Sequence, residues 1–384
     1  MPERIYLDWN ATTPLRPEAR QAMAAAWDIA GNPSSVHTEG RQARRLVEDA
    51  RAAVASAIGG RAQDVVFTSG GTEANALALT PGMRRGAGAP VRRLLASAIE
   101  HTSVLAGGRF APEAIETIAV TGTGVVDLGH LRGLLADGPA ALVSVMLANN
   151  ETGAIQPIPE VADIVHEAGG LVHVDAIQGL GKIPFDIKSM GADLVTLSAH
   201  KTGGPKGVGA LVMAEELQGL EPLLRGGGQE LGRRAGTENV AGIAAFGAAT
   251  TAAMEALSTE AARLHGLRKL LENGLMQTPG MIVFSAEVSR LPNTTLFTVP
   301  ALKAETAVIG FDLGGIAVSS GSACSSGKVQ PSHVLAAMGV AKDLAQGAVR
   351  LSLGWSTSEA DIDLALKAWR KLADGLLRGR RNTA

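Results

Sequence analysis

"LVHVDAIQG" at residues 171–179 and "DLVTLSAHKTGGPKG" at residues 193–207 are the two segments from which the class of fold follows. Each contains a short run that is apolar or β-branched on both alternating positions, as expected of a strand covered on both faces. Polar or glycine residues follow each run directly. Successive strands of this kind predict a parallel sheet whose ligand chemistry lies at the carboxyl ends of the strands.

Comparable runs on both sides extend the pattern. From about residue 65 they alternate with helical patterns, namely "VVFTSG" (65–70), "RRLLAS" (92–97), "ETIAV" (116–120), "ALVSVML" (141–147) and "GVGALVM" (207–213). This rhythm predicts an α/β fold with a mostly parallel central sheet and helices on both faces. An alanine-rich helix is predicted near 238–257.

After that helix the pattern predicts a smaller α+β domain. Its expected strands are "MIVFSA" (281–286), "NTTLFTV" (293–299), "GIAVSS" (315–320) and "AVRLSLG" (348–354), mixed with the helix "KAETAVIGFDL" (303–313). We predict a large domain at 15–257 and a small domain made of 1–14 and 258–384. The last helix is expected to begin with a capping box formed by Ser356 and Glu359.

Composition limits the classes of function. The chain has 384 residues, 46% of them hydrophobic, and a formal net charge of −2. No bulk positive field would gather nucleic acid, and no segment reaches the roughly 20 apolar residues of a membrane span. The single cysteine forms no internal disulfide and no zinc cluster, which favours a reducing cytoplasm and no metal. We therefore expect small molecules or proteins as partners.

Asp175 and Lys201 follow the two strands of the opening segments. Taken alone, Asp175 could be a helix cap and Lys201 a solvated loop lysine. Together they suit pyridoxal 5'-phosphate (PLP), which needs an amine for its Schiff base and a carboxylate facing its protonated ring nitrogen. Lys206 is the competing amine, but it lies further into the glycine-proline turn. The sequence favours Lys201.

Further polar groups follow other strands. "FTSGGTEANALAL" at 67–79 gives a strand, two glycines and Thr72 at the start of a helix, which is typical of a phosphate-binding turn but lacks the Walker spacing. His101 follows another strand and is either structural or a flat ring for stacking on a cofactor. Asn149 and Asn150 carry donors suited to a phenolate or a carboxylate.

These motifs resemble, nearly from end to end, the cysteine desulfurases, which are fold-type I PLP enzymes of the class V aminotransferase family. The matching stretches are "YLDWNATTP" (6–14), "GNPSSVHTEGR" (31–41), "TSGGTEANA" (68–76), "NNETG" (149–153), "HVDAIQ" (173–178), "SAHKTGGPKG" (198–207), "RRAGTENV" (233–240), "SSGSACSSG" (319–327), "PSHVLAAMG" (331–339) and "VRLSLG" (349–354). Trp9 is a departure, because similar proteins commonly have a smaller or polar residue there.

The resemblance implies a role for each matching residue. It implies that Lys201 holds the cofactor, Asp175 pairs with its pyridine nitrogen, Gln178 bonds its phenolate and His101 stacks on its ring. The implied phosphate ligands are Gly71, Thr72, Ser198 and His200, with Thr237 reaching the phosphate of a neighbouring subunit in a homodimer, and the implied substrate-carboxylate ligands are Asn150 and Arg350. The alternation in "AVRLSLG" independently turns Arg350 away from its apolar neighbours.

Cys324 is the only cysteine and lies among serines and glycines rather than in an apolar run. A lone cysteine is often a small buried hydrophobe, but by resemblance this one takes sulfur from L-cysteine as a persulfide, leaving L-alanine. His101 is a candidate base for its thiol. The sulfur would then pass to an acceptor or iron–sulfur scaffold protein. A selenocysteine lyase, a class V aminotransferase and a catalytically silent scaffold are the alternatives.

Overall fold

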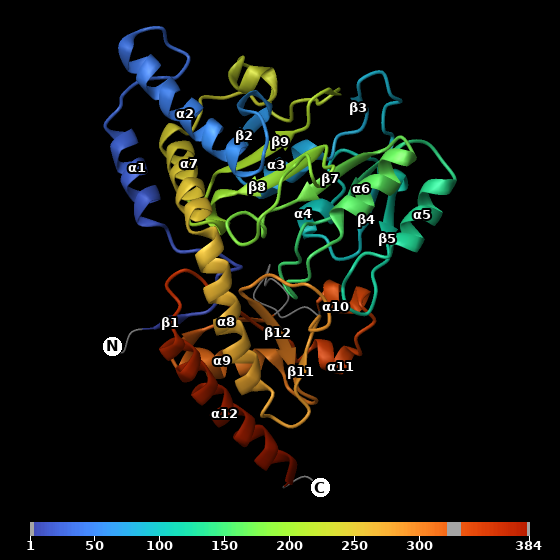
Figure 1. Cartoon of the computed structure of the whole chain (residues 1–384), viewed down its shortest axis with the longest axis vertical. Coiled ribbons are helices and arrows are strands. Elements are labelled where there is room, and N and C mark those ends of the chain that lie inside the picture. Colours follow the sequence, from blue (N-terminus) through green and yellow to red (C-terminus); the bar gives the residue numbers. More distant parts are fainter. Residues whose placement is uncertain (1–3, 321–331, 382–384) are drawn as a thin grey trace.

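The chain folds into a larger and a smaller part, which lie one above the other in Figure 1. The structure is a computed structural model, and it describes residues 4–320 and 332–381, with side chains up to residue 375. The larger part is built on a seven-stranded sheet of order β2-β9-β8-β7-β6-β4-β5. Its strands are β2 (Val65–Thr68), β4 (Arg93–Ser97), β5 (Ile115–Ile118), β6 (Ala141–Ser144), β7 (Leu171–Asp175), β8 (Leu194–Ser198) and β9 (Gly209–Met213).

All neighbouring strands from β8 to β5 are parallel, and β9 alone runs antiparallel to both of its neighbours. The prediction of an α/β fold with a mostly parallel sheet is confirmed, and every predicted strand of this part is present. β9 lies beside β8 because only a short turn after Lys201 joins the two strands, and a turn that short connects antiparallel neighbours.

Alternate residues of the strands enter two different apolar cores. Val143 packs with one face and Leu142 with the other, and Leu95 and Leu94 divide in the same way. The helices on the first face are α2 (Thr38–Ala57), α5 (Leu128–Ala136), α6 (Ile158–Glu167) and α7 (Val240–Glu255). Those on the second face are α3 (Gly71–Ala78) and α4 (Thr102–Leu105). Burial on both faces explains why apolar residues occupy both alternating positions of these strands.

Shorter elements complete the larger part. They are α1 (Pro17–Trp27), which packs on α7, the antiparallel pair β3 (Arg84–Arg85) and β10 (Leu217–Gln218), and the short helical turns η1 (Ala62–Asp64), η2 (Pro112–Ala114), η3 (Ala199–Lys201) and η4 (Gln229–Gly232).

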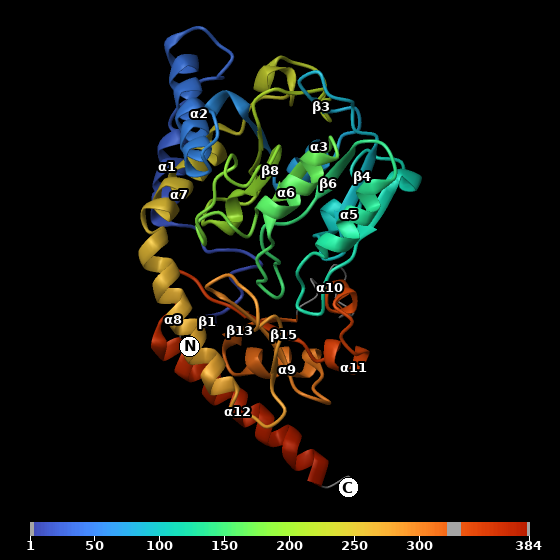
Figure 2. The same cartoon turned by 45° about the vertical axis from the view of Figure 1, so that its right-hand side comes forward.

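The smaller part has its own sheet, of order β11-β12-β15-β14, and its own apolar core. Its strands are β11 (Ile282–Val283), β12 (Thr294–Thr298), β14 (Ser319–Ser320) and β15 (Val349–Ser352), and its helices are α8 (Leu257–Leu275), α9 (Ala304–Leu313), α10 (His333–Ala337), α11 (Lys342–Ala345) and α12 (Glu359–Arg381). Figure 2 shows α8 and α12 lying against each other along one side. The predicted single strand at 315–320 is divided into β13 (Ile316–Ala317) and β14.

The N-terminal segment joins this smaller part. β1 (Ile5–Tyr6) pairs in parallel with β13, and Leu7 lies in the same core as α8 and α12. The domain limits given above stay a prediction.

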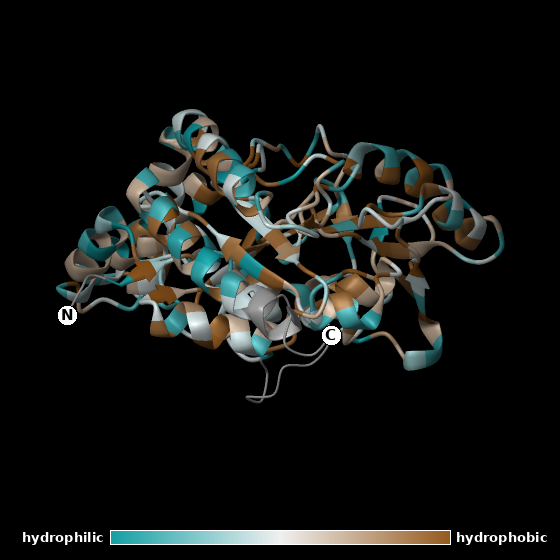
Figure 3. Cartoon of the chain, turned by 90° about the horizontal axis from the view of Figure 1, so that it is seen from below, coloured by the Kyte–Doolittle hydropathy of each residue, from teal (hydrophilic) through white to brown (hydrophobic). Residues whose placement is uncertain are grey.

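Seen from below in Figure 3, apolar residues concentrate on the strands, whereas hydrophilic residues alternate along the helices that surround them.

The predicted capping box of the last helix is wrong. Ser358 caps α12 instead: its backbone N–H and its hydroxyl both donate to Asp361 Oδ2, at 2.8 and 2.9 Å, and its hydroxyl accepts from the Asp361 N–H at 3.3 Å. The chain offers two serines within three residues of each other, each followed by an acidic residue three positions later. Ser356 belongs to the turn at Gly354–Thr357, in which the Thr357 N–H donates to the Gly354 oxygen at 3.0 Å. The helix therefore begins after Ser358 instead.

Among the described residues, no single helix has both the length and the apolar character to cross a bilayer. The helices α7 and α8 pass such a test only when taken together, and they are bent by 70° where they meet.

Candidate active site

A cavity of about 550 Å³ lies at the carboxyl ends of β7 and β8, between the larger and the smaller part. Parallel strands end at one edge of their sheet, so residues far apart in the sequence meet there. The predicted site residues that line this cavity are Gly71, Thr72, His101, Asn150, Asp175, Gln178, Ser198, His200, Lys201 and Arg350. The structure therefore brings these residues together, and their individual roles stay predictions.

Lys201 presents a buried primary amine to the cavity. Its Nζ donates to the backbone carbonyl oxygens of Asn10 at 2.7 Å and Ala11 at 2.8 Å. Burial, and after it the positive charge of Arg350, lowers the pKa of Lys201 to about 8 against the opposing effect of Asp8 and Asp175. The uncharged fraction of the amine near neutral pH is therefore far larger than in an ordinary lysine, as a nucleophile requires.

Asp175 is the last residue of β7, and its carboxylate is held by donors rather than by a direct ion pair. Asn75 Nδ2 donates to Oδ2 at 2.9 Å, and the Ile177 N–H donates to Oδ1 at 3.0 Å. Burial raises the pKa of Asp175, and these two hydrogen bonds oppose that rise. A cationic group that faces a buried carboxylate of this kind stabilises its charged form.

His101 belongs to the same polar chain as Asp175. Its Nδ1 accepts from the Ser103 N–H at 3.1 Å and lies 2.7 Å from Ser103 Oγ, which in turn accepts from Asn75 Nδ2 at 2.9 Å. The side chain thus caps α4. Burial lowers the pKa of His101, as does Lys201, whereas Asp175 raises it. The imidazole is therefore largely neutral at pH 7 and able to accept a proton.

The N-terminus of α3 forms the opposite wall of the cavity. Gly70 precedes the helix without a side-chain cap, so the first backbone N–H groups of α3 remain available to an anion. A Cβ on Gly71 would meet Ile177 Cδ1 at 2.3 Å and Ser198 Cβ at 3.3 Å, so a larger residue would displace the side chain of Ile177. His200, on the adjoining turn, bonds Thr12 Oγ1 at 3.0 Å, and burial lowers its pKa to about 4.

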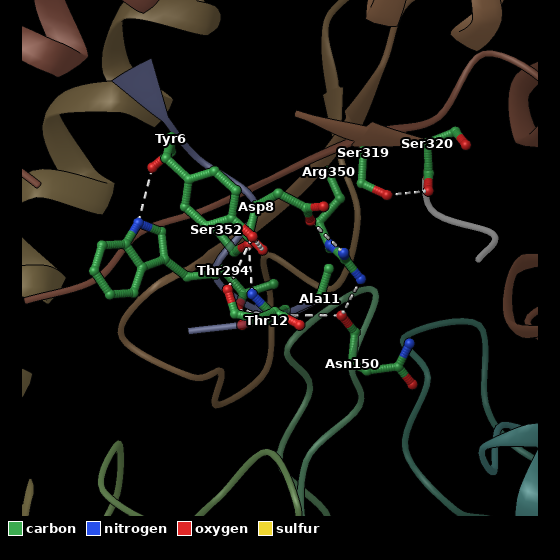
Figure 4. Close-up of polar contacts among 12 residues, drawn as sticks. Tyr6, Asp8, Ala11, Thr12, Asn150, Thr294, Ser319, Ser320, Arg350 and Ser352 are labelled. Carbon is green, nitrogen blue, oxygen red and sulfur yellow. Dashed lines mark hydrogen bonds and ion pairs between the residues drawn. The ribbon is translucent and has the colours of Figure 1, made fainter. Parts of the chain in front are cut away.

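Arg350 enters the cavity from β15 of the smaller part, as Figure 4 shows. Its Nη2 donates to Asp8 Oδ1 at 2.7 Å and its Nη1 to the backbone oxygen of Asn150 at 2.9 Å. Its Nε is buried and has no hydrogen-bond partner among the described residues. The side-chain amide of Asn150 extends away from Arg350 in Figure 4, so only the backbone of Asn150 holds the guanidinium.

The N-terminal segment supplies site residues to which the sequence analysis gave no role. Asp8, Asn10 and Ala11 line the cavity. The backbone oxygen of Asn10 accepts from Gln178 Nε2 at 3.0 Å as well as from Lys201. The stretch "YLDWNATTP" stands out in the sequence only through its family resemblance, and that match is the signal from which these residues could have been found.

Asn149 is not part of the cavity, contrary to its suggested role as a donor to a ligand. Its Nδ2 donates to the Ile99 backbone oxygen at 3.1 Å, and its Oδ1 accepts from the N–H groups of Glu151 and Thr152, both at 2.9 Å. The fully buried side chain is thus hydrogen-bonded to backbone groups of the protein and is not directed at a ligand. Lys206, the competing amine, is exposed and does not line the cavity.

Of the two remaining predicted site residues, one lies elsewhere and the other falls outside the described residues. Thr237 is exposed and lines a separate cavity of about 250 Å³ together with Arg234 and Asn239. Cys324 lies outside the described residues, so the prediction about its thiol rests on the sequence. Ser320, the last described residue before it, lines the main cavity.

The sheet, the buried amine and the carboxylate opposite a helix N-terminus define a PLP-dependent enzyme of fold type I. The aminotransferase class-V family matches residues 5–365. A cysteine desulfurase of Cereibacter sphaeroides is 42% identical over 382 residues, covering 97% of each chain, and an IscS-like cysteine desulfurase of Mycobacterium tuberculosis is 40% identical over 371 residues, covering 94% of each. The chain belongs to the class-V aminotransferase family and, within it, to the cysteine desulfurases.

Solved structures agree with this assignment. A NifS-like protein from Rickettsia africae superposes with a TM-score of 0.88 at 39% identity, covering 97% of this chain and 100% of that one. A structure described as SspA in complex with cysteine superposes with a TM-score of 0.74 at 29% identity, covering 91% of this chain and 98% of that one. The predicted family and fold type are confirmed.

The cofactor of this family is PLP, and the residues present fit it. The cavity offers an amine at Lys201, a carboxylate at Asp175 and, at Gly71 and Thr72, the uncapped N-terminus of α3, where a Cβ on Gly71 would crowd Ile177 and Ser198. These are the three groups that the aldehyde, the ring nitrogen and the phosphate of PLP require. In the described part of the chain, no three His, Cys, Asp or Glu side chains gather as a metal ion would need.

Proposed function

We propose that this enzyme is a cysteine desulfurase that removes sulfur from L-cysteine, releases L-alanine and leaves a persulfide on Cys324. The observation that carries the proposal is that Lys201, Asp175 and Arg350 face one cavity in a chain of this family. The amine and the carboxylate suit PLP chemistry, and the guanidinium suits the carboxylate of an amino-acid substrate.

The cavity orients the amino acid through its carboxylate. Arg350 presents a buried guanidinium that is already held by Asp8 and by the backbone of Asn150, so little further ordering is needed when a substrate binds. These contacts use one N–H of each Nη nitrogen, so the second N–H of Nη1 and of Nη2 remains for an anion. The side-chain amide of Asn150 is a further donor at the cavity.

Proton transfers fall to two groups with lowered pKa values. PLP, when bound, supplies the electron sink that makes loss of the substrate's α-proton possible. Lys201 Nζ, with a pKa of about 8, accepts that proton, and the carbonyl oxygens of Asn10 and Ala11 hold the amine close to the sheet edge. Neutral His101 is the proposed base for the Cys324 thiol, and its Nδ1 exchanges the hydrogen bond from the Ser103 N–H for the thiol proton.

The sulfur step then balances without an external oxidant. The Cys324 thiolate attacks the sulfur atom of the substrate, an S–S bond forms and the substrate's C–S bond breaks. The carbon fragment takes up protons and leaves as alanine. A persulfide remains on the enzyme and is passed to an acceptor protein for iron–sulfur cluster assembly or another sulfur-containing cofactor.

A homodimer in the cytoplasm belongs to the same proposal. Its support is that Thr237, whose counterpart in similar proteins reaches the phosphate of the neighbouring subunit, is exposed and lies apart from the main cavity of its own chain. The cytoplasmic location rests on the single cysteine of the sequence.

The experiment is a comparison of purified variants. The parent should be yellow and should form alanine and sulfide from cysteine in equal amounts when a reductant is present. Lys201→Ala should be colourless and inactive, whereas Lys206→Ala, which changes an exposed lysine five residues away, should match the parent. Cys324→Ala should stay yellow and lose cysteine desulfuration.

Three outcomes would contradict the proposal. Full activity of Cys324→Ala with cysteine and an acceptor protein would remove the thiol from the mechanism. Selenocysteine, measured beside cysteine, separates the desulfurase from a selenocysteine lyase, because a lyase would act on selenocysteine alone. Pyruvate formed from alanine and a keto-acid acceptor at a comparable rate would indicate an aminotransferase.

A further inference from the structure

Lys182 is a second buried lysine beside the cavity, and the mechanism above does not use it. Its Nζ donates to Gln178 Oε1 at 2.5 Å and to Asn10 Oδ1 at 3.1 Å. Among the side chains of residues 4–320 and 332–375, no carboxylate lies within ion-pair distance of this amine. Burial holds the pKa of Lys182 well below its usual range, and the charges of Lys201 and Arg350 act in the same direction.

A buried lysine without an anionic partner is costly, so its position is hard to explain by stability alone. A methionine or leucine would fill the same space without an amine to desolvate. The two acceptors of Lys182 are both side-chain amide oxygens of residues at the cavity, Gln178 and Asn10. Its contacts are therefore directed at the site.

These contacts determine which end of the Gln178 amide faces the cavity. A side-chain amide can turn over, and its oxygen and nitrogen then exchange places. Lys182 Nζ donates to Gln178 Oε1 in this arrangement, so the amide oxygen is directed to Lys182. The Nε2 group is left to donate one hydrogen to the Asn10 backbone oxygen at 3.0 Å and to present the other to the cavity.

Asn10 is oriented in the same way. Its Oδ1 accepts from Lys182 and from Asn293 Nδ2 at 3.2 Å, while its Nδ2 donates to Thr294 Oγ1 at 2.8 Å. The backbone oxygen of the same residue holds both Gln178 Nε2 and Lys201 Nζ. Lys182 thus supports the residue on which two cavity donors converge.

We propose that Lys182 is a positioning residue that fixes the side-chain amide of Gln178 with its Nε2 donor toward the phenolate oxygen of PLP. This inference rests on the proposed contact of Gln178 with that oxygen. A donor at the phenolate competes for the oxygen with the proton that the oxygen otherwise shares with the neighbouring Schiff-base nitrogen. Without the donor, that proton is held more tightly, and the pH midpoint of the cofactor's visible absorption band rises.

The test is a double-mutant cycle read from the absorption spectrum of the holoenzyme between pH 5 and 10. Lys182→Met keeps the side-chain length and removes the amine, and Gln178→Leu removes the amide. Each single variant should raise the midpoint by about one pH unit, the value of one hydrogen bond to a charged group. The double variant should show the shift of Gln178→Leu alone, because Lys182 acts through Gln178.

The control variant is Lys188→Met, which removes an exposed lysine from the same segment and should leave the midpoint unchanged. The affinity of apoenzyme for PLP, measured by fluorescence quenching, is the second readout and should fall about tenfold in Lys182→Met. If Lys182→Met does not fold, Lys182→Leu carries the same expectation.

The outcomes separate this inference from the proposed function. A shift in Gln178→Leu with none in Lys182→Met, or shifts that add in the double variant, would overturn the role of Lys182 and leave the desulfurase intact. No shift in either variant would show that Gln178 does not contact the phenolate oxygen, and the inference would be wrong with it. A parent protein that binds no PLP would contradict the proposed function itself.

Discussion

Glu151 should make the protein less stable as the pH rises, and Glu151→Gln should remove that loss. The side chain lies in the loop after Asn150 and is 2% exposed. One of its oxygens accepts from Ser332 Oγ at 2.5 Å, and Ser332 caps α10 by accepting from the Leu335 N–H at 3.1 Å. Burial raises the pKa of Glu151 to about 7, although the Ser332 hydrogen bond and Arg350 oppose the rise.

The magnitude follows from the difference between the folded and unfolded pKa values. In the unfolded chain the carboxyl ionises near its ordinary pKa of 4.5, whereas in the folded protein it keeps its proton up to about pH 7. Between these values the folded state binds more protons, so the free energy of unfolding falls as the pH rises. At about 1.4 kcal/mol for each pH unit, the loss reaches about 3 kcal/mol above pH 7.

Glutamine keeps the shape and an oxygen for Ser332 but does not ionise. We therefore expect Glu151→Gln to be more stable than the parent by about 3 kcal/mol at pH 8 and by less than about 1 kcal/mol at pH 5. Urea unfolding of the apoenzymes at pH 5, 6, 7 and 8, followed by tryptophan fluorescence, measures the difference through the shift in midpoint.

Glu160→Gln is the matched control, because it makes the same chemical change at an exposed position of α6. Its effect on the midpoint should be small and the same at every pH. Equal midpoints for parent and Glu151→Gln at pH 8, or a gain that is the same at pH 5 and pH 8, would show that burial does not raise the pKa of Glu151 and would refute the reasoning.

Three further predictions concern the site and its surroundings. Arg350→Lys should raise KM for cysteine at least tenfold, because lysine cannot replace the planar fork held by Asp8, and an unchanged KM in steady-state kinetics would contradict this. The rate at which apoenzyme regains its visible absorption with PLP should increase with pH to a midpoint near 8, the pKa of Lys201, since only the neutral amine reacts; a midpoint above 10 would be inconsistent. Gly354→Ala should lower the thermal midpoint by several degrees, because its Cβ would lie 1.9 Å from the Trp9 ring, and an unchanged melt in circular dichroism would count against that contact.

Much of the fold was predictable because burial on both faces leaves a strong pattern. Strands such as β7 and β8 have apolar residues on both alternating positions, and their polar last residues, Asp175 and Ser198, mark one edge of the sheet. Asp175 and Lys201 could therefore be placed together from the sequence alone. The start of the last helix was harder to predict, because Ser356 and Ser358 are equivalent N-cap candidates for α12. Only the preceding turn selected Ser358.

The surroundings of the candidate site were not predictable in the same way. Asn149 and Asn150 have the same side chain and are adjacent. The side chain of Asn149 is hydrogen-bonded to the backbone, whereas Asn150 lines the cavity. In the sequence, Lys182 is an ordinary lysine that follows a glycine. Its contact with Asn10 joins residues 172 positions apart, and a local sequence pattern cannot predict a contact between such distant residues.

The amino-acid sequence by itself determined the βα order, the edge of the sheet where ligands bind, and the amine and carboxylate of a PLP enzyme, because each depends on the periodicity or chemistry of a few adjacent residues. Only the tertiary structure decided that Asp8 and Asn150 hold Arg350, that Glu151 is buried against Ser332, and that Lys182 directs the amide of Gln178. The physical reason is that hydrogen-bond orientation and desolvation depend on groups brought together from distant parts of the chain.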